Sequence, residues 1–514
     1  MSITEYGPSA ADLNETVVLA LNSCQGRELL NGTRYRVINS GFTSDPMPGY
    51  GDVLKSSISL FRATVYDYTR GLTILWRGVP GDLSQIFSSI SNEQPLPNAE
   101  EIAEAASIAG ARLDSNEVVH SSLPPVITRE FADGSSHRIL NIVINSGTSS
   151  RIVEVNMNNR SVVTRVPSGG PSCHAPKWAP IGVASDQGVP GTVNFVISQG
   201  GRTLWTFQAV RPSSSSGLHG SGIELRNVKY NGKTVLYRAH VPILNVEYER
   251  EVSGCGRHYR DLQWAEFPFQ CNGSDISSSG FRLCSSPAKT ILDTNVDGGN
   301  FRGVAVYVEG QEVVLKSVML TGWYRYISEW RFHVNGSLRP RWGFAGVLEG
   351  NQCICVPHHH HVYWRFDFDI ETAGNNLVRE FNNPPIFSSN YHDKLFEIRR
   401  LKDPSRQRHW EISNMKSGRT YALIPGPNDG TSSGFGVGDV WILQYHGNEL
   451  DDGFPKGVIW GLPEEVKEHI DDFLTGEVVK DKDVVIWYAA HFRHVQTVGH
   501  TGHIVGPDIH PIRW

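Results

Sequence analysis

The sequence predicts a mainly β protein in which a large antiparallel β-sandwich follows two small α+β domains. Three observations support this fold class. Most of the chain consists of short segments in which apolar and polar residues alternate, separated by Gly, Asn and Pro turns. Glycine is abundant, with 51 residues, and only 19% of residues are charged. The length of 514 residues exceeds what one hydrophobic core normally holds, so several domains are expected.

The first small domain is predicted over residues 1–95, where the alternating segments are RYRVINS, LFRATVYDY and LTILWRGVP. The second is predicted over 96–212. It begins with a helix over PNAEEIAEAASIAGARL, which has glutamates in its first turn and an apolar stripe along one side. The strands expected after this helix are HRILNIVINS, RIVEVNMNN and TVNFVIS.

The serine-rich segment RPSSSSGLHGSG at 211–222 predicts a flexible linker. Beyond it, residues 217–514 are predicted to form the β-sandwich, because short alternating segments continue almost to the end of the chain. One helix is expected in this region, over LPEEVKEHIDDFL from Leu462.

Composition argues against several classes of partner. The net charge of −6 provides no basic surface, so nucleic acid is not expected. No segment approaches the roughly 18 apolar residues of a membrane span, and the N-terminus lacks a signal-peptide pattern, so a cytoplasmic protein is the default expectation. Seven cysteines do not suggest a disulfide framework, and Cys353 and Cys355 suit buried thiols as well as a metal.

Four consecutive histidines open the segment HHHHVYWRFDFDIE, which predicts a strand. Side chains alternate along a strand, so His358 and His360 share one face while His359 and His361 share the other. Two imidazoles spaced in this way form half of a transition-metal site, and solvated histidines at a strand end are the alternative interpretation. A third ligand is expected from the C-terminal histidines His491, His494, His500, His503 and His510.

Several ordered motifs resemble the copper amine oxidases. The segment GIELRNVKYNGKTVLYRAHVPILNVEYE is similar to the strand pair that opens the family's catalytic domain. PHHHHVYWRFDFDIE resembles its His-x-His strand, and DKDVVIWYAAHFRHV resembles the segment that carries its third copper histidine. Three intervening pieces also follow the family pattern, namely RHWEISN, RTYALIPGP and GDVWILQYHGNELDDG. The resemblance covers about residues 217–514 and extends more weakly over the N-terminal part.

The resemblance implies two metal sites. The implied copper ligands are His358, His360 and His494. A second cation, usually assigned as calcium in the family, is implied at Asp367, Phe368, Asp369, Asp483 and Val484, where the two apolar residues contribute carbonyl oxygens. A charged strand face is the alternative interpretation of the aspartates.

The resemblance also implies a cofactor. Tyr324, within LTGWYRYISEW, matches the tyrosine that copper and O2 convert into topaquinone in the family, and Tyr248 matches a tyrosine that hydrogen-bonds this quinone. Trp323 replaces a family Asn and Arg325 replaces an acidic residue. The arginine reverses a charge beside the ring, which leaves two outcomes open: a stabilised phenolate, or a ring that is never oxidised.

The family's catalytic base has no direct match. The Asp that removes the α-proton of the substrate corresponds to Ala265 in HYRDLQWAEFPFQC. Glu266 or Asp261 serves as the base only with a local shift, and burial would raise the pKa of such a carboxyl group into a useful range. The family's disulfide also lacks a match, because Cys284 is present but GVAVYVEG contains no partner for it.

Three hypotheses follow. The first is an oxidase that uses a quinone from Tyr324 to convert a primary amine and O2 into an aldehyde, H2O2 and ammonia. The second is a copper enzyme on the same scaffold that performs a different oxidation without topaquinone. The third is a non-catalytic descendant that retains the metal. A homodimer is expected from the resemblance.

Overall fold

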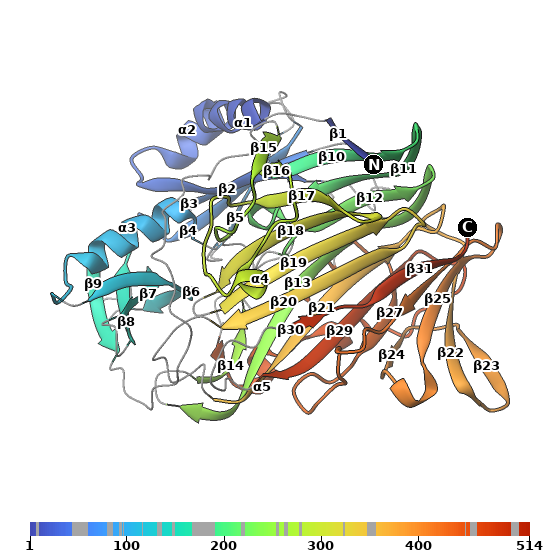
Figure 1. The fold of residues 1–514 in the computed structure, drawn as a ribbon. Helices are drawn as coiled ribbons and strands as arrows, with labels where there is room; N and C mark the ends of the chain where they lie inside the picture. Colours follow the sequence, from blue (N-terminus) through green and yellow to red (C-terminus); the bar gives the residue numbers. More distant parts are fainter. Residues whose placement is uncertain are drawn as a thin grey trace.

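Two large β-sheets dominate the computed structural model of the protein (Figure 1). The structure describes the chain apart from residues 7–9, 44–59, 80–85, 92–94, 96, 116, 131–135, 146–149, 167–190, 217–220, 253–255, 262–265, 277–279, 322–323, 347–355, 448, 453–459 and 495–502.

The first large sheet contains eleven strands, in the order β1-β10-β11-β12-β13-β21-β29-β27-β24. The strands on this path are β1 (Ser2–Tyr6), β10 (Thr192–Gln199), β11 (Arg202–Val210), β12 (Glu224–Tyr230), β13 (Lys233–Val252), β21 (His358–Phe368), β29 (Val484–His494), β27 (Val440–Gln444) and β24 (Ile398–Arg400). Beside β13 lie β14 (Gly256–Arg260) and then β28 (Trp460–Gly461).

The second large sheet contains twelve strands, in the order β15-β16-β17-β18-β19-β20-β31-β26-β25-β22-β23, with β30 beside β20. Its strands are β15 (Gly273–Ile276), β16 (Phe281–Cys284), β17 (Val304–Glu309), β18 (Glu312–Thr321), β19 (Tyr324–His333), β20 (Leu338–Gly346), β31 (Asp508–Arg513), β26 (Thr420–Ile424), β25 (His409–Asn414), β22 (Asn376–Ile386), β23 (Ser389–Lys394) and β30 (His503–Val505). Neighbouring strands are antiparallel except β16 and β17, which are parallel.

The two large sheets pack face to face, and the main hydrophobic core lies between them. Phe207 of β11 stacks on Phe332 of β19, with ring centroids 4.1 Å apart. Trp330 of β19 meets Phe366 of β21 edge to face at 6.5 Å. Side chains that alternate along each strand therefore place one apolar row in this core. The predicted mainly β fold with a large antiparallel sandwich is confirmed.

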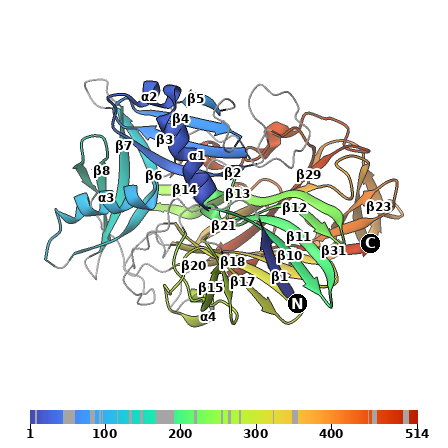
Figure 2. The ribbon, with the colours of Figure 1, turned by 90° about the horizontal axis from the view of Figure 1, so that it is seen from above.

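Two four-stranded sheets lie beside the sandwich (Figure 2). The first consists of β2 (Tyr35–Thr43), β3 (Leu60–Asp67), β4 (Leu72–Gly78) and β5 (Ile86–Ser91), and it packs against α1 (Ala10–Asn22) and α2 (Cys24–Leu30). The second consists of β6 (Val118–Glu130), β7 (Ser136–Asn145), β8 (Ser150–Asn156) and β9 (Ser161–Val166), and it packs against α3 (Ala99–Gly110). The domain boundaries at 95 and 212 remain predictions.

Parts of the N-terminal segment belong to the large sheets instead. Strand β1 pairs with β10, and β10 and β11 continue the first large sheet, so TVNFVIS is not a strand of the second small sheet as predicted. The predicted flexible linker is also wrong for its described residues. Arg211, Ser214 and Ser221 are buried, and the N–H and hydroxyl of Ser216 bond to the Glu224 carboxylate. Small hydroxyl side chains suit this hydrogen-bonded connection between β11 and β12, which are neighbouring strands of the first large sheet.

The helical predictions have mixed outcomes. Helix α3 is confirmed, and the Asn98 side chain caps it by accepting a hydrogen bond from the N–H of Glu101 at 2.8 Å. The helix predicted from Leu462 is wrong in length, because only α5 (Pro463–Val466) and a 3-10 turn, η4 (Ile470–Phe473), form. Between them the N–H of His469 donates to the Asp452 carboxylate at 2.9 Å, which diverts it from a helical bond.

The remaining short helices are η2 (Pro212–Ser214), α4 (Ile291–Thr294) and η3 (Pro404–Arg406). Among the helices that the structure describes, none has both the length and the apolar character that crossing a bilayer requires.

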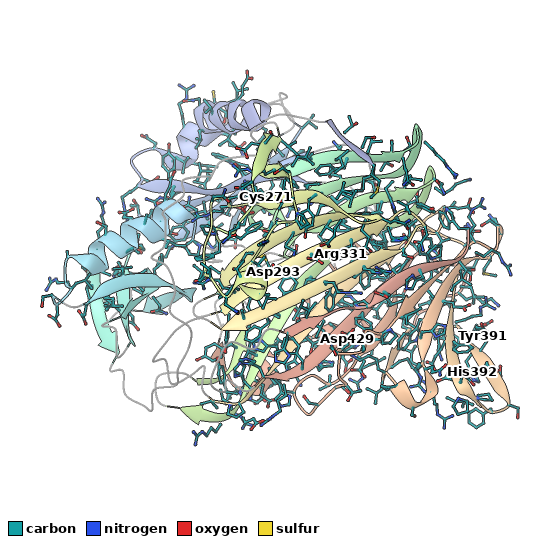
Figure 3. The ribbon with its side chains drawn as sticks, viewed as in Figure 1. Cys271, Asp293, Arg331, Tyr391, His392 and Asp429 are labelled. Atoms are coloured by element: carbon teal, nitrogen blue, oxygen red, sulfur yellow. A yellow bond between two sulfur atoms is a disulfide. The ribbon has the colours of Figure 1, made fainter. Side chains whose placement is uncertain are left out.

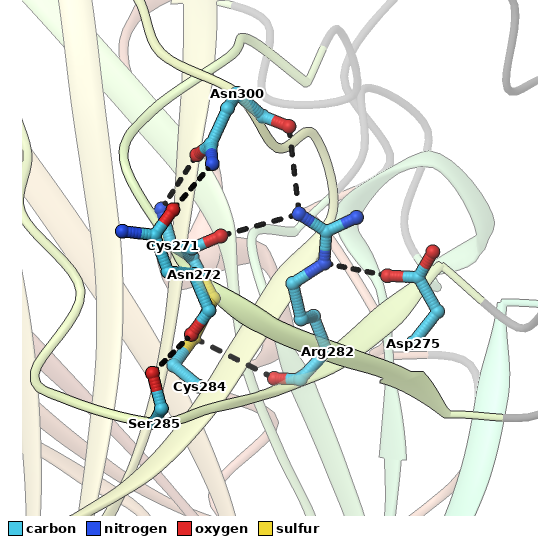
Figure 4. Close-up of a disulfide and its surroundings, with 7 residues drawn as sticks. All are labelled: Cys271, Asn272, Asp275, Arg282, Cys284, Ser285 and Asn300. Atoms are coloured by element: carbon cyan, nitrogen blue, oxygen red, sulfur yellow. Dashed lines mark hydrogen bonds and ion pairs between the residues drawn. A yellow bond between two sulfur atoms is a disulfide. The ribbon is translucent and has the colours of Figure 1, made fainter.

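Cys284 forms a disulfide with Cys271, a residue outside the segment GVAVYVEG in which the family's partner was sought (Figure 4). The two residues are 13 positions apart, with Cα atoms separated by 5.6 Å. The β15–β16 hairpin explains the pairing, because its register sets Gly273 opposite Cys284 and so brings Cys271 alongside. The predicted thiols Cys353 and Cys355 lie outside the described residues.

Candidate metal centre

Strand β21 brings the predicted metal ligands together from distant parts of the sequence. It lies between β13 and β29, and His358 is paired in register with His494 of β29 on one side and with Tyr248 of β13 on the other. His358 and His360 point into the core between the large sheets, where both are fully buried. The period-2 pattern of the strand thus places two imidazoles and the third histidine on one face.

Three ring nitrogens converge at this point. The ligand atoms of His358, His360 and His494 all lie within 4.8 Å of one another. Nε2 of His358 is 3.1 Å from Nδ1 of His494, and Nε2 of His360 has no hydrogen-bond partner among the described residues. A buried nitrogen that lacks a partner is costly unless something binds it. Imidazole donors suit copper, zinc, iron or nickel, so the arrangement fits a transition-metal ion.

Burial keeps the imidazoles of His358 and His360 neutral. It lowers the pKa of His358 to about 4, although a hydrogen bond to the Val356 carbonyl opposes the shift. Burial also lowers the pKa of His360 well below its usual value, and the neighbouring His358 adds to this shift. Nδ1 of His358 donates to the Val356 carbonyl at 2.6 Å, so the lone pair remains on Nε2, which faces the other two rings. Neutral nitrogens of this kind are the form that binds a metal.

Two phenols adjoin the three histidines. Tyr324, the first residue of β19, places its hydroxyl 3.2 Å from Nε2 of His358, and its ring centroid is 5.2 Å from that of His360. The hydroxyl of Tyr248 contacts the hydroxyl of Tyr324. Both rings are buried, and Phe344 packs against the Tyr324 ring and against the imidazoles. A tyrosine ring therefore lies within reach of a metal bound by the histidines.

A buried carboxyl group also reaches the centre. Asp261 follows β14, and its N–H donates to the Leu244 carbonyl at 2.7 Å, which anchors it beside β13. Its carboxyl accepts a hydrogen bond from Tyr326 at 2.5 Å. Burial raises the pKa of Asp261 to about 7, and the bond from Tyr326 moderates the shift. A carboxyl group that titrates near neutral pH can serve as a general base.

Glu266 has a different set of partners from those expected of a base. Its two oxygens accept hydrogen bonds from the Arg211 guanidinium, one of them at 2.8 Å, and from Ser213. This buried ion pair connects the segment after β11 to the strand region beside Met319. The carboxylate is thus committed to a structural contact. Ala265, the residue at the family's Asp position, lies outside the described residues.

Curated relatives resemble parts of the chain. It is 24% identical over 270 residues to "Primary amine oxidase 1" of Arabidopsis thaliana, a match that covers 40% of this chain and 41% of the relative. It is 25% identical over 338 residues to "Primary amine oxidase 2" of the same plant, covering 51% of this chain and 48% of the relative. Over these regions the chain is similar to plant primary amine oxidases. No family model matches it.

Solved structures of copper amine oxidases share the fold. A copper-containing benzylamine oxidase from Hansenula polymorpha superimposes with a TM-score of 0.60 at 12% identity, over 100% of this chain and 93% of the other. A lysyl oxidase from Pichia pastoris superimposes with a TM-score of 0.57 at 11% identity, over 99% and 89%. The matches to the plant relatives span less than half of those proteins, so they leave the activity to be inferred from the site.

The departure from the copper amine oxidase pattern at Arg325 has a structural explanation. Arg325 lies on the opposite face of β19 from Tyr324 and forms two hydrogen bonds with Asp297, at 2.9 and 2.8 Å. Both side chains are buried, and the guanidinium also lies over the Phe267 ring. The expected charge reversal beside the ring is therefore neutralised by Asp297 on the far side of the strand. Trp323 lies outside the described residues.

The three aspartates implied as a second cation site also come together. The carboxylate oxygens of Asp367, Asp369 and Asp483 lie within 4.8 Å of one another. Phe368 and Val484 are paired in register across β21 and β29, so the backbone between the aspartates is close as well. Hard oxygen donors in this number suit Ca²⁺.

Sequence reasoning missed one residue of the centre. Tyr326 lies two positions after Tyr324 on β19, so both side chains occupy the inner face. Its hydroxyl bonds to Asp261 and lies 3.2 Å from Nδ1 of His360. The i, i+2 spacing from the predicted quinone precursor was the only signal in the sequence that placed it near the metal.

Proposed function

We propose that the protein is a copper-dependent oxidase that converts a primary amine, O2 and water into an aldehyde, H2O2 and ammonia. One observation carries the proposal: the Tyr324 hydroxyl lies 3.2 Å from a nitrogen of the buried three-histidine cluster. His358, His360 and His494 would hold copper, and burial keeps the imidazoles of His358 and His360 in the neutral form that binds a metal. The family resemblance supplies the substrate class and the cofactor.

Copper and O2 would convert the Tyr324 ring into a quinone, whose carbonyl group supplies the electrophile for a primary amine. Tyr248 would hydrogen-bond an oxygen of this ring, since its hydroxyl already contacts that of Tyr324. Phe344 and the sheets around the ring would exclude water from it. These residues hold the ring, so its orientation does not depend on the replaced family Asn at position 323 alone.

We assign proton abstraction to Asp261 and not to Glu266. Asp261 is buried within the group of side chains around Tyr326 and His360, and a pKa near 7 allows it both to accept and to release a proton. Glu266 is paired with Arg211, which would have to be displaced before the carboxylate could act as a base. Asp261 would therefore perform the role of the family Asp from a position four residues earlier than Ala265.

The proposal includes calcium at Asp367, Asp369 and Asp483, because three carboxylates cluster there and Ca²⁺ prefers oxygen donors of this kind. It also includes a homodimer, which the family resemblance predicts. Metal analysis after removal of loosely bound ions tests the first point, and light scattering during size-exclusion chromatography tests the second.

Peptide mass spectrometry across Tyr324 tests the central proposal. After the protein is loaded with copper in air, the peptide is expected to gain the mass of quinone formation and to stain in a quinone redox assay. Tyr324→Phe serves as the matched control and should show neither change. Release of H2O2 from simple primary amines should depend on the same modification. Copper binding and O2 uptake with an unmodified Tyr324 would instead support a different copper-dependent oxidation.

A further inference from the structure

Tyr326 connects a carboxylate to a copper-binding imidazole. Its hydroxyl donates to Asp261 at 2.5 Å and lies 3.2 Å from Nδ1 of His360. Tyr326 and His360 are fully buried, and Asp261 is nearly so. The three side chains come from β19, the segment after β14, and β21, so the contact joins both large sheets.

The number of hydrogens available in this contact determines which ring nitrogen of His360 carries a hydrogen. The phenol has one hydrogen to donate, and an ionised carboxylate can only accept one. While Asp261 is ionised, the hydrogen of Tyr326 therefore points to Asp261, and His360 must donate from Nδ1 to the phenol oxygen. The lone pair of His360 is then on Nε2, the atom that has no partner among the described residues and that belongs to the cluster with His358 and His494.

We propose that Tyr326 is a positioning residue of the copper centre, which holds His360 as its Nδ1–H form and presents Nε2 to the metal. This inference rests on the proposed function, because it assumes that copper binds the three histidines. Hydrogen bonds from a metal-binding histidine to a second residue orient the ring and increase its basicity. Here that second residue also contacts the proposed base, so the amine site and the copper site share one phenol.

Strand β21, which carries His360, provides a matched control for Tyr326. Tyr363 of β21 is also fully buried, and its hydroxyl donates to Glu468 at 2.9 Å. Burial raises the pKa of Glu468 to about 7, as it does for Asp261. Tyr363 faces away from the three-histidine cluster, because it lies an odd number of positions from His358 and His360. Removing either hydroxyl breaks an equivalent bond, but only one of the two bonds leads to the metal.

The first test compares Cu²⁺ affinity in Tyr326→Phe and Tyr363→Phe by competition with a chelator. Tyr326→Phe should bind Cu²⁺ about 10–100-fold more weakly, which is the usual effect of losing such a hydrogen bond. Its electron paramagnetic resonance spectrum should also change, because one nitrogen ligand is less well oriented. Tyr363→Phe should match the wild type in both measurements. Equal affinities and spectra for all three proteins would overturn the proposal.

The second test uses metal-free protein. In ¹⁵N-histidine NMR, with His360 assigned by a His360→Gln variant, the wild type should show the Nδ1–H form, and Tyr326→Phe should shift toward the Nε2–H form. An unchanged tautomer would contradict the inference. Because no copper is present, this result is independent of the proposed function, which fails instead if the wild type does not bind Cu²⁺.

Asp261→Leu keeps the test decisive if Tyr326→Phe does not fold. Without the carboxylate, the phenol hydrogen is free to donate to Nδ1 of His360, so the tautomer and the Cu²⁺ affinity should change in the same direction although the phenol remains. Retention of the Nδ1–H form in this variant would show that Tyr326 does not determine it.

Discussion

The two faces of strand β21 contain histidines with the same burial and opposite surroundings. On the inner face, His360 is connected through Tyr326 to Asp261, and its Nε2 meets the nitrogens of His358 and His494. On the outer face, Nδ1 of His361 lies 2.8 Å from Nδ1 of His491. Nε2 of His491 bonds to the Gly438 carbonyl at 2.9 Å and lies 3.2 Å from Asp439. His360 and His361, which are adjacent in the sequence, thus each begin a buried row of interacting side chains. One row ends at Asp261 and the other at Asp439.

The two faces of β21 differ in how many unprotonated imidazole nitrogens point to the same place. On the outer face, His491 donates from Nε2, so its Nδ1 accepts a hydrogen bond from Nδ1–H of His361, and Nε2 of His361 has no partner among the described residues. Among the described residues, no group of three ligand atoms that lie close to one another includes this pair. On the inner face, three nitrogens converge without a carboxylate among them. Burial of histidines alone therefore does not make a metal site, whereas the number of unprotonated nitrogens that face one point does.

The surroundings of the outer pair support a structural role. Lys402 donates to the carbonyls of Asp429 and Ala489, and Tyr488 donates to the Asp429 carboxylate at 2.5 Å. Asp429 is labelled in Figure 3, close to the red strands near the C-terminus. These bonds attach the loop after β26 to β29, so the outer polar groups stabilise the strand that carries His494.

Removal of a ligand on the inner face should have the largest effect. His494→Ala should lower Cu²⁺ affinity by more than about 100-fold and should abolish oxidase activity. This loss exceeds the one expected when a residue that only hydrogen-bonds a ligand, such as Tyr326, is replaced. His358→Ala should have the same effect. Equilibrium dialysis with metal analysis measures the bound copper. His361→Ala, the outer control, should retain one copper per chain, and a loss equal to that of His494→Ala would remove the distinction between the faces.

The next prediction compares the two aspartates at which these rows of hydrogen-bonded side chains end, Asp261 on the inner face and Asp439 on the outer face. Asp261→Asn should lower kcat by about 10²–10⁴-fold, the usual contribution of a general base, while copper remains bound. Asp439→Asn should change kcat by less than about threefold, since ordinary substitutions away from the chemistry leave the transition state intact. Steady-state H2O2 release measures both. Comparable losses of kcat in the two variants would contradict the assignment of Asp261.

The same two variants should rank in the opposite order for stability, with the larger loss in Asp439→Asn. Asp439→Asn should lower the free energy of unfolding by about 3 kcal/mol, because it removes a buried charge that faces His491 and Lys402. Asp261→Asn should cost less than about 1 kcal/mol, because an amide oxygen still accepts the bond from Tyr326. Urea unfolding of the copper-free proteins provides the comparison. A larger loss in Asp261→Asn would argue that its role is structural.

The smallest effect concerns pH. The base must be ionised to accept a proton, so kcat/KM should fall about tenfold for each pH unit below the pKa of Asp261, near 7, and level off above it. Copper should stay bound well below that range, because protons compete for His358 only near its pKa of about 4. Activity and bound copper measured from pH 5 to 9 separate the two. Parallel loss of copper and activity near pH 7 would exclude Asp261 as the titrating group.

Local patterns in the sequence predicted much of the centre. The i, i+2 spacing placed His358 and His360 on one face, and gap-free motif spacing selected His494 from five C-terminal histidines. Helix α3 followed from the glutamates in its first turn and from its apolar stripe. Contacts between segments that are far apart in the sequence were harder to predict. The serine-rich segment was mistaken for a linker because its burial depends on Glu224 and Arg211, and the partner of Cys284 depended on hairpin register.

The sequence by itself determined which residues share a strand face and which motifs occur in order, because period-2 geometry and motif spacing are local properties of the chain. Only the tertiary structure decided that Asp297 neutralises Arg325, that Arg211 occupies Glu266, and that Tyr326 links Asp261 to His360. Those outcomes depend on which side chains from the two sheets meet in a water-poor core, where each charge and each proton needs a partner from another segment.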